Sequence, residues 1–257
     1  MKKMLELQQL SIGYAASKKS VKPLMPAISV SLDKGELVAL TGPNGAGKTT
    51  LFRVISSNLK PLQGKVFIDG KDIADLSARQ KAGLLSIVLT DRVGENFMKV
   101  YDVVASGRYP YTGLWARLTL EDEKIIDRSL ELSGAAVLAD RLMQSLSDGE
   151  RQKVMIAKAL AQDTPLILLD EPSAFLDYPS KIALIQLLKK LALDFNKTIL
   201  FSSHDLDMIM RQVDKLWLMS PEKPMLSGTP DKLLADGKLQ TYFGMEFIPN
   251  EAVLGDK

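Results

Sequence analysis

The sequence contains no cysteine among its 257 residues, which excludes disulfides and thiolate metal sites. It also lacks any apolar stretch close to the roughly 20 residues that a membrane-spanning helix needs, and residues 1–6 lack the apolar core of a signal peptide. We therefore expect a cytoplasmic protein. The formal net charge is only +2, so charge gives no indication of a nucleic-acid partner.

The hydrophobic content of 46% is enough for a sizeable core, and its pattern differs along the chain. Short apolar stretches separated by turns predict strands within residues 4–40, and helical spacing predicts a helix over residues 49–59. Two continuous apolar runs flank a predicted helix over residues 180–193, a pattern typical of buried parallel strands joined by a crossover. The two runs are residues 166–169 and 198–201. Further strands are predicted over residues 65–68, 84–89 and 216–219.

Helical apolar spacing dominates the middle of the chain, in residues 120–132, 135–138 and 151–161. We therefore expect an α/β protein of one domain, residues 1–257, with a helical subdomain over about residues 91–161. We also expect a C-terminal tail from about residue 243 to residue 257.

A glycine-rich segment follows a predicted strand and precedes a predicted helix, with four residues between the first Gly and Gly-Lys-Thr. This pattern predicts a phosphate-binding loop, in which backbone N–H groups and the helix N-terminus surround phosphate oxygens. Lys48 would reach the β- and γ-phosphates, and the Thr49 hydroxyl would bind Mg²⁺. The residues assigned to this loop are Gly42, Pro43, Asn44, Gly45, Ala46, Gly47, Lys48, Thr49 and Thr50.

Three polar residues follow the next apolar strands. Asp170 ends a fully apolar run, where a carboxylate is costly unless a cation compensates it, so we expect it to serve Mg²⁺. Glu171 can orient and polarise the water that attacks the γ-phosphate, although an acidic helix cap or a solvated glutamate is the alternative. His204, the only histidine, fits a γ-phosphate sensor better than a core histidine.

The segment Ser147-Asp148-Gly149-Glu150, together with the motifs above, resembles the signature motif of the ATP-binding subunits of ABC transporters, and the likeness covers nearly all of the chain. The resemblance implies a P-loop NTPase core with a mainly parallel sheet, an N-terminal antiparallel β subdomain and an inserted helical subdomain. Ser147, the Gly149 amide and the helix dipole would form a second anion site. That site would cap the ATP held by Lys48 of another copy, in a head-to-tail dimer. An ordinary capping box with Glu150 is the alternative.

Smaller features extend the resemblance and also limit it. Tyr14 matches the aromatic residue that stacks on adenine, with a core aromatic as the alternative. Asp177 lies in a segment that resembles the loop passing between the two active sites, or it belongs to a solvated turn. Thr90 stands where the family usually has a glutamine that approaches Mg²⁺ and reports on the transport partner. Either Thr90 acts through a water, or Asp91 contributes, or this segment carries no such chemistry.

Residues 106–113, which contain Gly-Arg-Tyr-Pro, are similar to a segment found in ATPases of importers for ferric siderophores, haem and cobalamin. In that group the segment lies near the permease-docking groove; an ordinary loop with aromatic packing is the alternative. The resemblance implies hydrolysis of ATP with Mg²⁺, and a homodimer bound to a membrane permease dimer at the inner face of the cell membrane. A substrate-binding protein would be an indirect partner. An ABC exporter subunit or a non-transport ABC ATPase is the alternative function.

Overall fold

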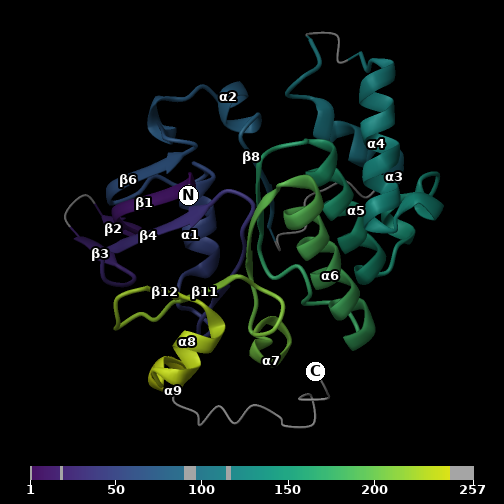
Figure 1. The fold of residues 1–257 in the computed structure, drawn as a ribbon. Coiled ribbons are helices and arrows are strands. Elements are labelled where there is room, and N and C mark those ends of the chain that lie inside the picture. Colours follow the sequence, from purple (N-terminus) through teal and green to yellow (C-terminus); the bar gives the residue numbers. More distant parts are fainter. Residues whose placement is uncertain (1, 18–19, 90–96, 114–116, 244–257) are drawn as a thin grey trace.

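The computed structural model describes residues 2–17, 20–89, 97–113 and 117–243. Two larger β-sheets, a two-stranded sheet and a group of helices make up this part of the chain (Figure 1). None of the described helices has the length and the apolarity needed to cross a membrane.

The larger sheet has six strands in the order β12-β11-β5-β10-β9-β8. All neighbouring pairs are parallel except β11 and β12, so the expected mainly parallel sheet is confirmed. Every residue of β5, β9 and β10 is buried, which explains their continuous apolar sequences. The strands are β5 (Leu37–Thr41), β8 (Leu85–Val88), β9 (Leu166–Leu169), β10 (Thr198–Ser202), β11 (Lys215–Leu218) and β12 (Leu226–Gly228).

The second sheet is antiparallel, with the order β4-β1-β6-β7, and β2 and β3, which follow β1 in the sequence, form a separate antiparallel pair. Leu7 of β1 pairs with Val30 on one side and with Val66 on the other. The apolar side chains of this sheet share one core with those of β5 and with the helix after it. The strands are β1 (Lys3–Ser11), β2 (Gly13–Ser17), β3 (Ser20–Pro23), β4 (Ile28–Asp33), β6 (Gln63–Ile68) and β7 (Lys71–Asp72).

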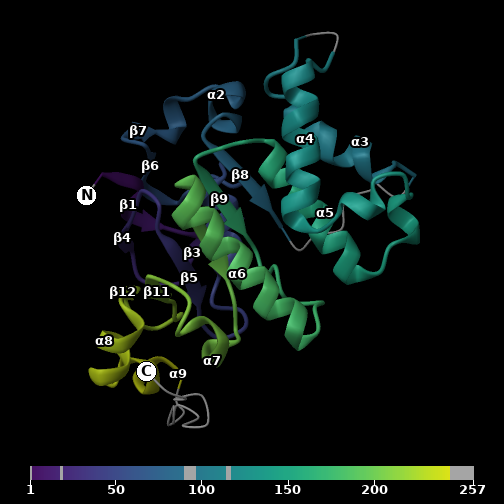
Figure 2. The same cartoon turned by 45° about the vertical axis from the view of Figure 1, so that its right-hand side comes forward.

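Helix α1 (Lys48–Ile55) lies between the two sheets, with Leu51 and Phe52 fully buried in the shared core. It is shorter than the helix expected over residues 49–59, because the chain turns at Ser57, whose φ of 63° is not helical. On the opposite face of the large sheet, α6 (Tyr178–Phe195) packs Leu184 and Leu188 against β9 and β10 (Figure 2). The remaining helices of this half are α2 (Ala78–Ala82), α7 (Leu206–Ile209), α8 (Pro230–Ala235) and α9 (Lys238–Phe243), and the 3₁₀ turn is η1 (Ile73–Asp75).

Helices α3 (Val100–Ala105), α4 (Leu120–Ser133) and α5 (Asp148–Ala161) stand together at one side of the molecule and enclose a third apolar cluster (Figures 1 and 2). Helix α5 belongs to two cores, because Val154 faces α3 and α4 whereas Ile156 joins the cluster of the large sheet. The helical spacing at residues 135–138 corresponds to a 3₁₀ turn rather than an α-helix. The 3₁₀ turns here are η2 (Ser106–Arg108), η3 (Ala136–Leu138) and η4 (Met143–Ser145).

The expected C-terminal tail begins inside a helix, since Phe243 is the last residue of α9. Residues 244–257 lie outside the described residues.

Candidate active site

The loop between β5 and α1 is shaped by backbone positions that a side chain would disturb. A Cβ atom on Gly42 would lie 2.3 Å from the Met219 carbonyl oxygen, and Gly47 has a φ of 101°. Gly47 is the N-cap of α1 and provides no side-chain cap, so the first N–H groups of the helix have no side-chain acceptor there. The loop and the helix N-terminus therefore present N–H groups suited to an anion.

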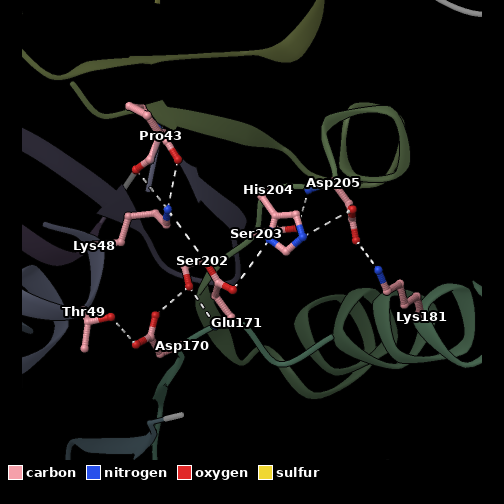
Figure 3. A network of polar contacts seen from close by, with 11 residues as sticks. Pro43, Lys48, Thr49, Asp170, Glu171, Lys181, Ser202, Ser203, His204 and Asp205 are labelled. Carbon is pink, nitrogen blue, oxygen red and sulfur yellow. Dashed lines mark hydrogen bonds and ion pairs between the residues drawn. The ribbon is translucent and has the colours of Figure 1, made fainter. Parts of the chain in front are cut away.

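Lys48, the first residue of α1, is buried under this loop. Its ammonium group donates to the carbonyl oxygens of Gly42 (2.9 Å) and Pro43 (3.4 Å) and lies 3.9 Å from Glu171 Oε1 (Figure 3). The ammonium group therefore lies between the loop and the Glu171 carboxylate. A phosphate bound in the loop would bring a second negative charge close to it.

Asp170 follows β9 and is 2% exposed, with both carboxylate oxygens held. The Thr49 hydroxyl donates to Oδ2 (2.6 Å) and the Ser202 hydroxyl donates to Oδ1 (2.7 Å) (Figure 3). A hydroxyl and a carboxylate are the hard oxygen donors that Mg²⁺ prefers, so Thr49 and Asp170 fit the magnesium role expected of them.

Glu171 turns away from Asp170 because its backbone adopts a φ of 46°, an uncommon conformation for a residue other than glycine. Its N–H group donates to the Ser202 hydroxyl (2.7 Å), which fixes the turn. The carboxylate then lies between Lys48 and His204, with Oε2 3.6 Å from His204 Nδ1. The side chain is 26% exposed beside these two groups, and its role as a base stays a prediction.

His204 follows β10, and its side chain is 55% exposed, so the alternative of a core histidine is wrong. Its Nε2 lies 3.8 Å from Asp205 Oδ1, and Asp205 is itself paired with Lys181 of α6 at 2.7 Å (Figure 3). The ring is therefore accessible beside Glu171, where a polar group of a bound nucleotide could contact it.

Ser202 was not among the candidates from the sequence, yet its hydroxyl connects Asp170 with the backbone of Glu171. The signal available in the sequence was a polar residue that closes an apolar run, and the structure shows that this residue is fully buried. A buried hydroxyl needs partners, and here the partners are the two residues expected to act.

Tyr14 lies beside the loop rather than in the core. Its phenol oxygen is 3.1 Å from the hydroxyl of Thr50, and its side chain is exposed. The core-aromatic alternative is therefore wrong. An accessible ring adjacent to the first turn of α1 fits the expected stacking on adenine.

Ser147 is the N-cap of α5 and forms a complete capping box with Glu150. The Ser147 N–H donates to Glu150 Oε2 at 2.8 Å, which lowers the pKa of Glu150, and Arg141 pairs with the same carboxylate. The capping-box alternative is thus correct as local structure, and it leaves Ser147 exposed at a helix N-terminus. Among the described residues, the hydrogen bonds that join Ser147, Glu150 and Arg141 stay within this region and do not reach residues 42–50.

Asp177 is the N-cap of α6, where it accepts a hydrogen bond from the Ser180 N–H at 3.0 Å. Hydrogen bonding from Ser180 lowers the pKa of the Asp177 carboxyl group. Within this chain Asp177 therefore fixes the end of the loop that follows Glu171.

Arg108, in the Gly-Arg-Tyr-Pro segment, is buried and structural. It pairs with Asp122 of α4 (2.8 Å), donates to the carbonyl oxygen of Ala161 in α5 (2.9 Å) and stacks on Tyr111. The alternative of a loop with aromatic packing describes this arginine well, whereas Tyr109 beside it is exposed.

Thr90 and Asp91, the two candidates for the place of the usual glutamine, lie outside the described residues.

The fold and this geometry define a class of protein. A glycine-rich loop between β5 and α1, an acidic pair after β9 and a histidine after β10 have the arrangement expected of a P-loop nucleotide hydrolase (Figure 3). The model of the ABC transporter family matches residues 25–174. The chain belongs to this family as an ATPase cassette, and the predicted family and fold class are confirmed.

Two relatives illustrate the likeness. An uncharacterized ABC transporter ATP-binding protein of Methanocaldococcus jannaschii is 42% identical over 98% of this chain and 85% of its own length. The iron(3+)-hydroxamate import ATP-binding protein of Bacillus subtilis is 36% identical over 94% of this chain and 88% of its own length.

Two solved structures share the fold. A metal-chelate type ABC transporter in an inward-facing conformation has a TM-score of 0.80, with 27% identity over 95% of this chain and 90% of that chain. A dimeric bacterial ABC transporter cassette has a TM-score of 0.77, with 25% identity over 88% of this chain and 99% of that chain.

Proposed function

We propose that this protein hydrolyses ATP as a head-to-tail homodimer and thereby powers an importer of metal chelates, of the ferric-siderophore, haem or cobalamin type. The observation that carries the hydrolytic part is the position of the Glu171 carboxylate, 3.9 Å from Lys48 Nζ and 3.6 Å from His204 Nδ1. The substrate class is supported by the hydroxamate importer among the relatives and by the metal-chelate type transporter among the structures.

The residues divide the work by their chemistry. The loop N–H groups and Lys48 bind the phosphates, and Tyr14 offers its exposed ring to the adenine. Thr49 and Asp170 would hold Mg²⁺, which supplies neutralisation of phosphate charge when bound. Glu171 orients a water and accepts its proton as the oxygen attacks the γ-phosphorus and the bond to the β-phosphate oxygen breaks, giving ADP and phosphate.

Completion of the site requires a second copy. Ser147 caps an exposed helix N-terminus whose contacts lie away from the chain's own loop, so it would meet the ATP of the partner. The dimeric cassette among the similar structures supports such an arrangement. A permease dimer at the inner face of the cell membrane, supplied by a separate substrate-binding protein, completes the proposed system.

The hydrolytic proposal is tested with the purified chain. Phosphate release from ATP should require Mg²⁺ and should stop when the metal is chelated, while nucleotide binding through Lys48 persists more weakly. Hydrolysis that continues without any divalent cation would contradict the roles given to Thr49 and Asp170.

The transport proposal needs cells. Deletion of the coding sequence should abolish uptake of a radiolabelled ferric hydroxamate or of labelled cyanocobalamin, and the wild-type chain should restore it. A chain with Glu171→Gln should not restore uptake. Normal uptake of ferric siderophores, haem and cobalamin in the deletion strain would contradict the proposed substrate class.

A further inference from the structure

A pocket of about 350 Å³ lies directly beside the phosphate loop. Its walls come from three parts of the chain: Pro43 and Asn44 in the loop, His204 and Leu206 after β10, and Leu239 and Phe243 on α9. The lining thus joins the nucleotide site to the last helix that the structure describes.

The chemistry of this pocket suits an uncharged apolar group. None of the residues described around it is a lysine, an arginine or an acid, and Leu206, Leu239 and Phe243 are the large apolar residues among them. Thr41 also lines it, and the Thr41 hydroxyl is buried without a hydrogen-bond partner in the described part of the chain. An incoming apolar side chain could therefore bury its surface against these walls.

An exposed aromatic side chain of suitable size occurs in the loop between β9 and α6. Phe175 is 53% exposed, although phenylalanine is a residue type that is most often buried. The loop that carries it is held on both sides, because the Ala174 N–H donates to the Glu171 carbonyl oxygen (3.1 Å) and Asp177 caps α6. Phe175 is therefore presented by an ordered turn.

This turn touches the signature segment within one chain. A Cβ atom on Gly149 would lie 3.3 Å from Leu176 Cδ2 and 4.0 Å from the Phe175 carbonyl oxygen, so the two segments are in contact. Whatever brings residues 147–150 to the ATP of a partner must also bring Phe175 to the surroundings of that ATP. The pocket beside the partner's phosphate loop is an apolar site in those surroundings.

We propose that Phe175 of each protomer inserts into the pocket of the other, between the phosphate loop, the start of α7 and α9. The inference rests on the head-to-tail dimer of the proposed function and extends it. Dimerisation then buries an aromatic ring that is exposed in the single chain, and it makes α9 part of the ATP-dependent interface. Loss of this ring should weaken the dimer by at least about tenfold.

The absence of native cysteine permits a direct test. Two variants are made in the Glu171→Gln background, one with Phe175→Cys and one with Phe243→Cys, and they are mixed with ATP and a short bis-maleimide. The expected product is a cross-linked pair that contains one of each variant and forms only with ATP. Leu193→Cys replaces Phe175→Cys in the control, because Leu193 is also exposed but lies near the far end of α6, and it should give no such product.

The outcomes separate the two levels of the proposal. An ATP-dependent dimer seen by gel filtration without the mixed cross-link would overturn the insertion of Phe175 and leave the dimer standing. Absence of any ATP-dependent dimer would overturn both. A double variant, Phe175→Cys with Phe243→Cys, that cross-links within one monomeric chain would show that the pocket's occupant comes from the same chain and would also overturn the proposal.

Affinity gives a second, independent measurement. Phe175→Ala should raise the dissociation constant of the ATP-bound dimer by at least about tenfold, Phe175→Leu should restore most of the affinity, and nucleotide affinity of the single chain should stay unchanged. Leu193→Ala is the matched control and should leave the dimer unchanged. Equal dimer affinities for Phe175→Ala and the parent chain would contradict the proposal.

Discussion

Single side chains at the ends of β9 and β10 decide the chemistry of this cassette. Asp170 and Glu171 are neighbours in sequence, but the positive φ of Glu171 directs their carboxylates to different partners. Ser202 stabilises both positions with one hydroxyl, which donates to Asp170 and accepts from the Glu171 N–H. The acidic pair therefore divides into a residue suited to a metal and a residue suited to a water.

Glu171→Gln should lower the rate of ATP hydrolysis by about 100-fold or more, because the amide keeps the shape but cannot accept a proton. ATP binding should persist, since Lys48 and the loop are unchanged. Phosphate release and calorimetric titration measure the two effects, and Glu121→Gln, at an exposed position of α4, is the control. Wild-type turnover in the Glu171 variant would remove this residue from the role of base.

Ser202→Ala should lower turnover about tenfold while changing ATP affinity little, because the Glu171 N–H loses its side-chain acceptor and Asp170 loses one donor, and a lost buried hydrogen bond costs about 1–3 kcal/mol. The control is Ser129→Ala, another buried serine, whose hydroxyl donates to the Ile125 carbonyl oxygen of the same helix. A steady-state comparison of kcat and KM measures the effect. Equal kcat values for the two variants would mean that the bridge between Asp170 and Glu171 is dispensable.

At the scale of elements, α5 connects the helical side of the molecule to the large sheet, and a buried ion pair fixes its far end. Arg108 contacts Asp122 of α4 and the last turn of α5 at once, and both members of the pair are buried. This anchoring explains why the segment around residue 108 is rich in polar and aromatic residues without forming a catalytic site.

Arg108→Met should lower the free energy of unfolding by about 3–5 kcal/mol, because it leaves the Asp122 carboxylate buried without its partner. Lys124→Met, which breaks the exposed pair with Glu121, should change it by less than about 1 kcal/mol. Denaturant titration of the two variants measures both values. Similar stabilities would indicate that water satisfies Asp122 as well as the arginine does.

Acid should weaken the same region. Hydrogen bonds from Thr119 and the contact with Arg108 hold the pKa of Asp122 below its usual range. A lowered folded-state pKa gives stability that is present above the unfolded pKa of about 3.9 and is lost as the pH falls through the folded pKa. Below pH 4 the parent chain should therefore lose stability more steeply than Asp122→Asn in denaturant titrations. Parallel curves would contradict this linkage.

At the scale of the whole molecule, the N-termini of α1 and α5, the two predicted anion-binding ends, have separate surroundings in one chain. In the proposed head-to-tail dimer each site would take its phosphate loop from one chain and its signature segment from the other, and this arrangement can be tested without a permease. The test combines two variant chains, one with a damaged phosphate loop and one with a damaged signature segment.

Lys48→Ala and Ser147→Arg should each abolish hydrolysis in a homodimer, because every site then contains one defect. Mixing the two variants should recover activity, because one of the two sites in a mixed dimer takes its loop and its signature from the undamaged segments. Phosphate release across mixing ratios measures the recovery. Inactivity at every ratio would contradict a site shared between chains.

Local sequence determined much of the fold and the core of the site. The apolar runs of β9 and β10 predicted buried parallel strands because a strand covered on both faces needs no polar residue. The phosphate loop was readable because its glycines and Lys48 act through neighbouring backbone. The predicted helix ends were less accurate. The helix expected to reach residue 59 ends before Ser57, whose positive φ is not revealed by the spacing of apolar residues.

Tertiary structure decided what depends on residues far apart in the chain. The Thr49 hydroxyl meets a carboxylate 121 residues away, and Ser202 gained its role only because β10 pairs with β9. Arg108 is structural because α4 and α5 close around it, and the pocket beside the loop exists because α9 returns to that edge of the sheet. The sequence by itself determined which chemical groups are available, since short motifs specify their own backbone. The packing of distant elements determined which groups meet, because long-range contacts leave no fixed spacing in the sequence.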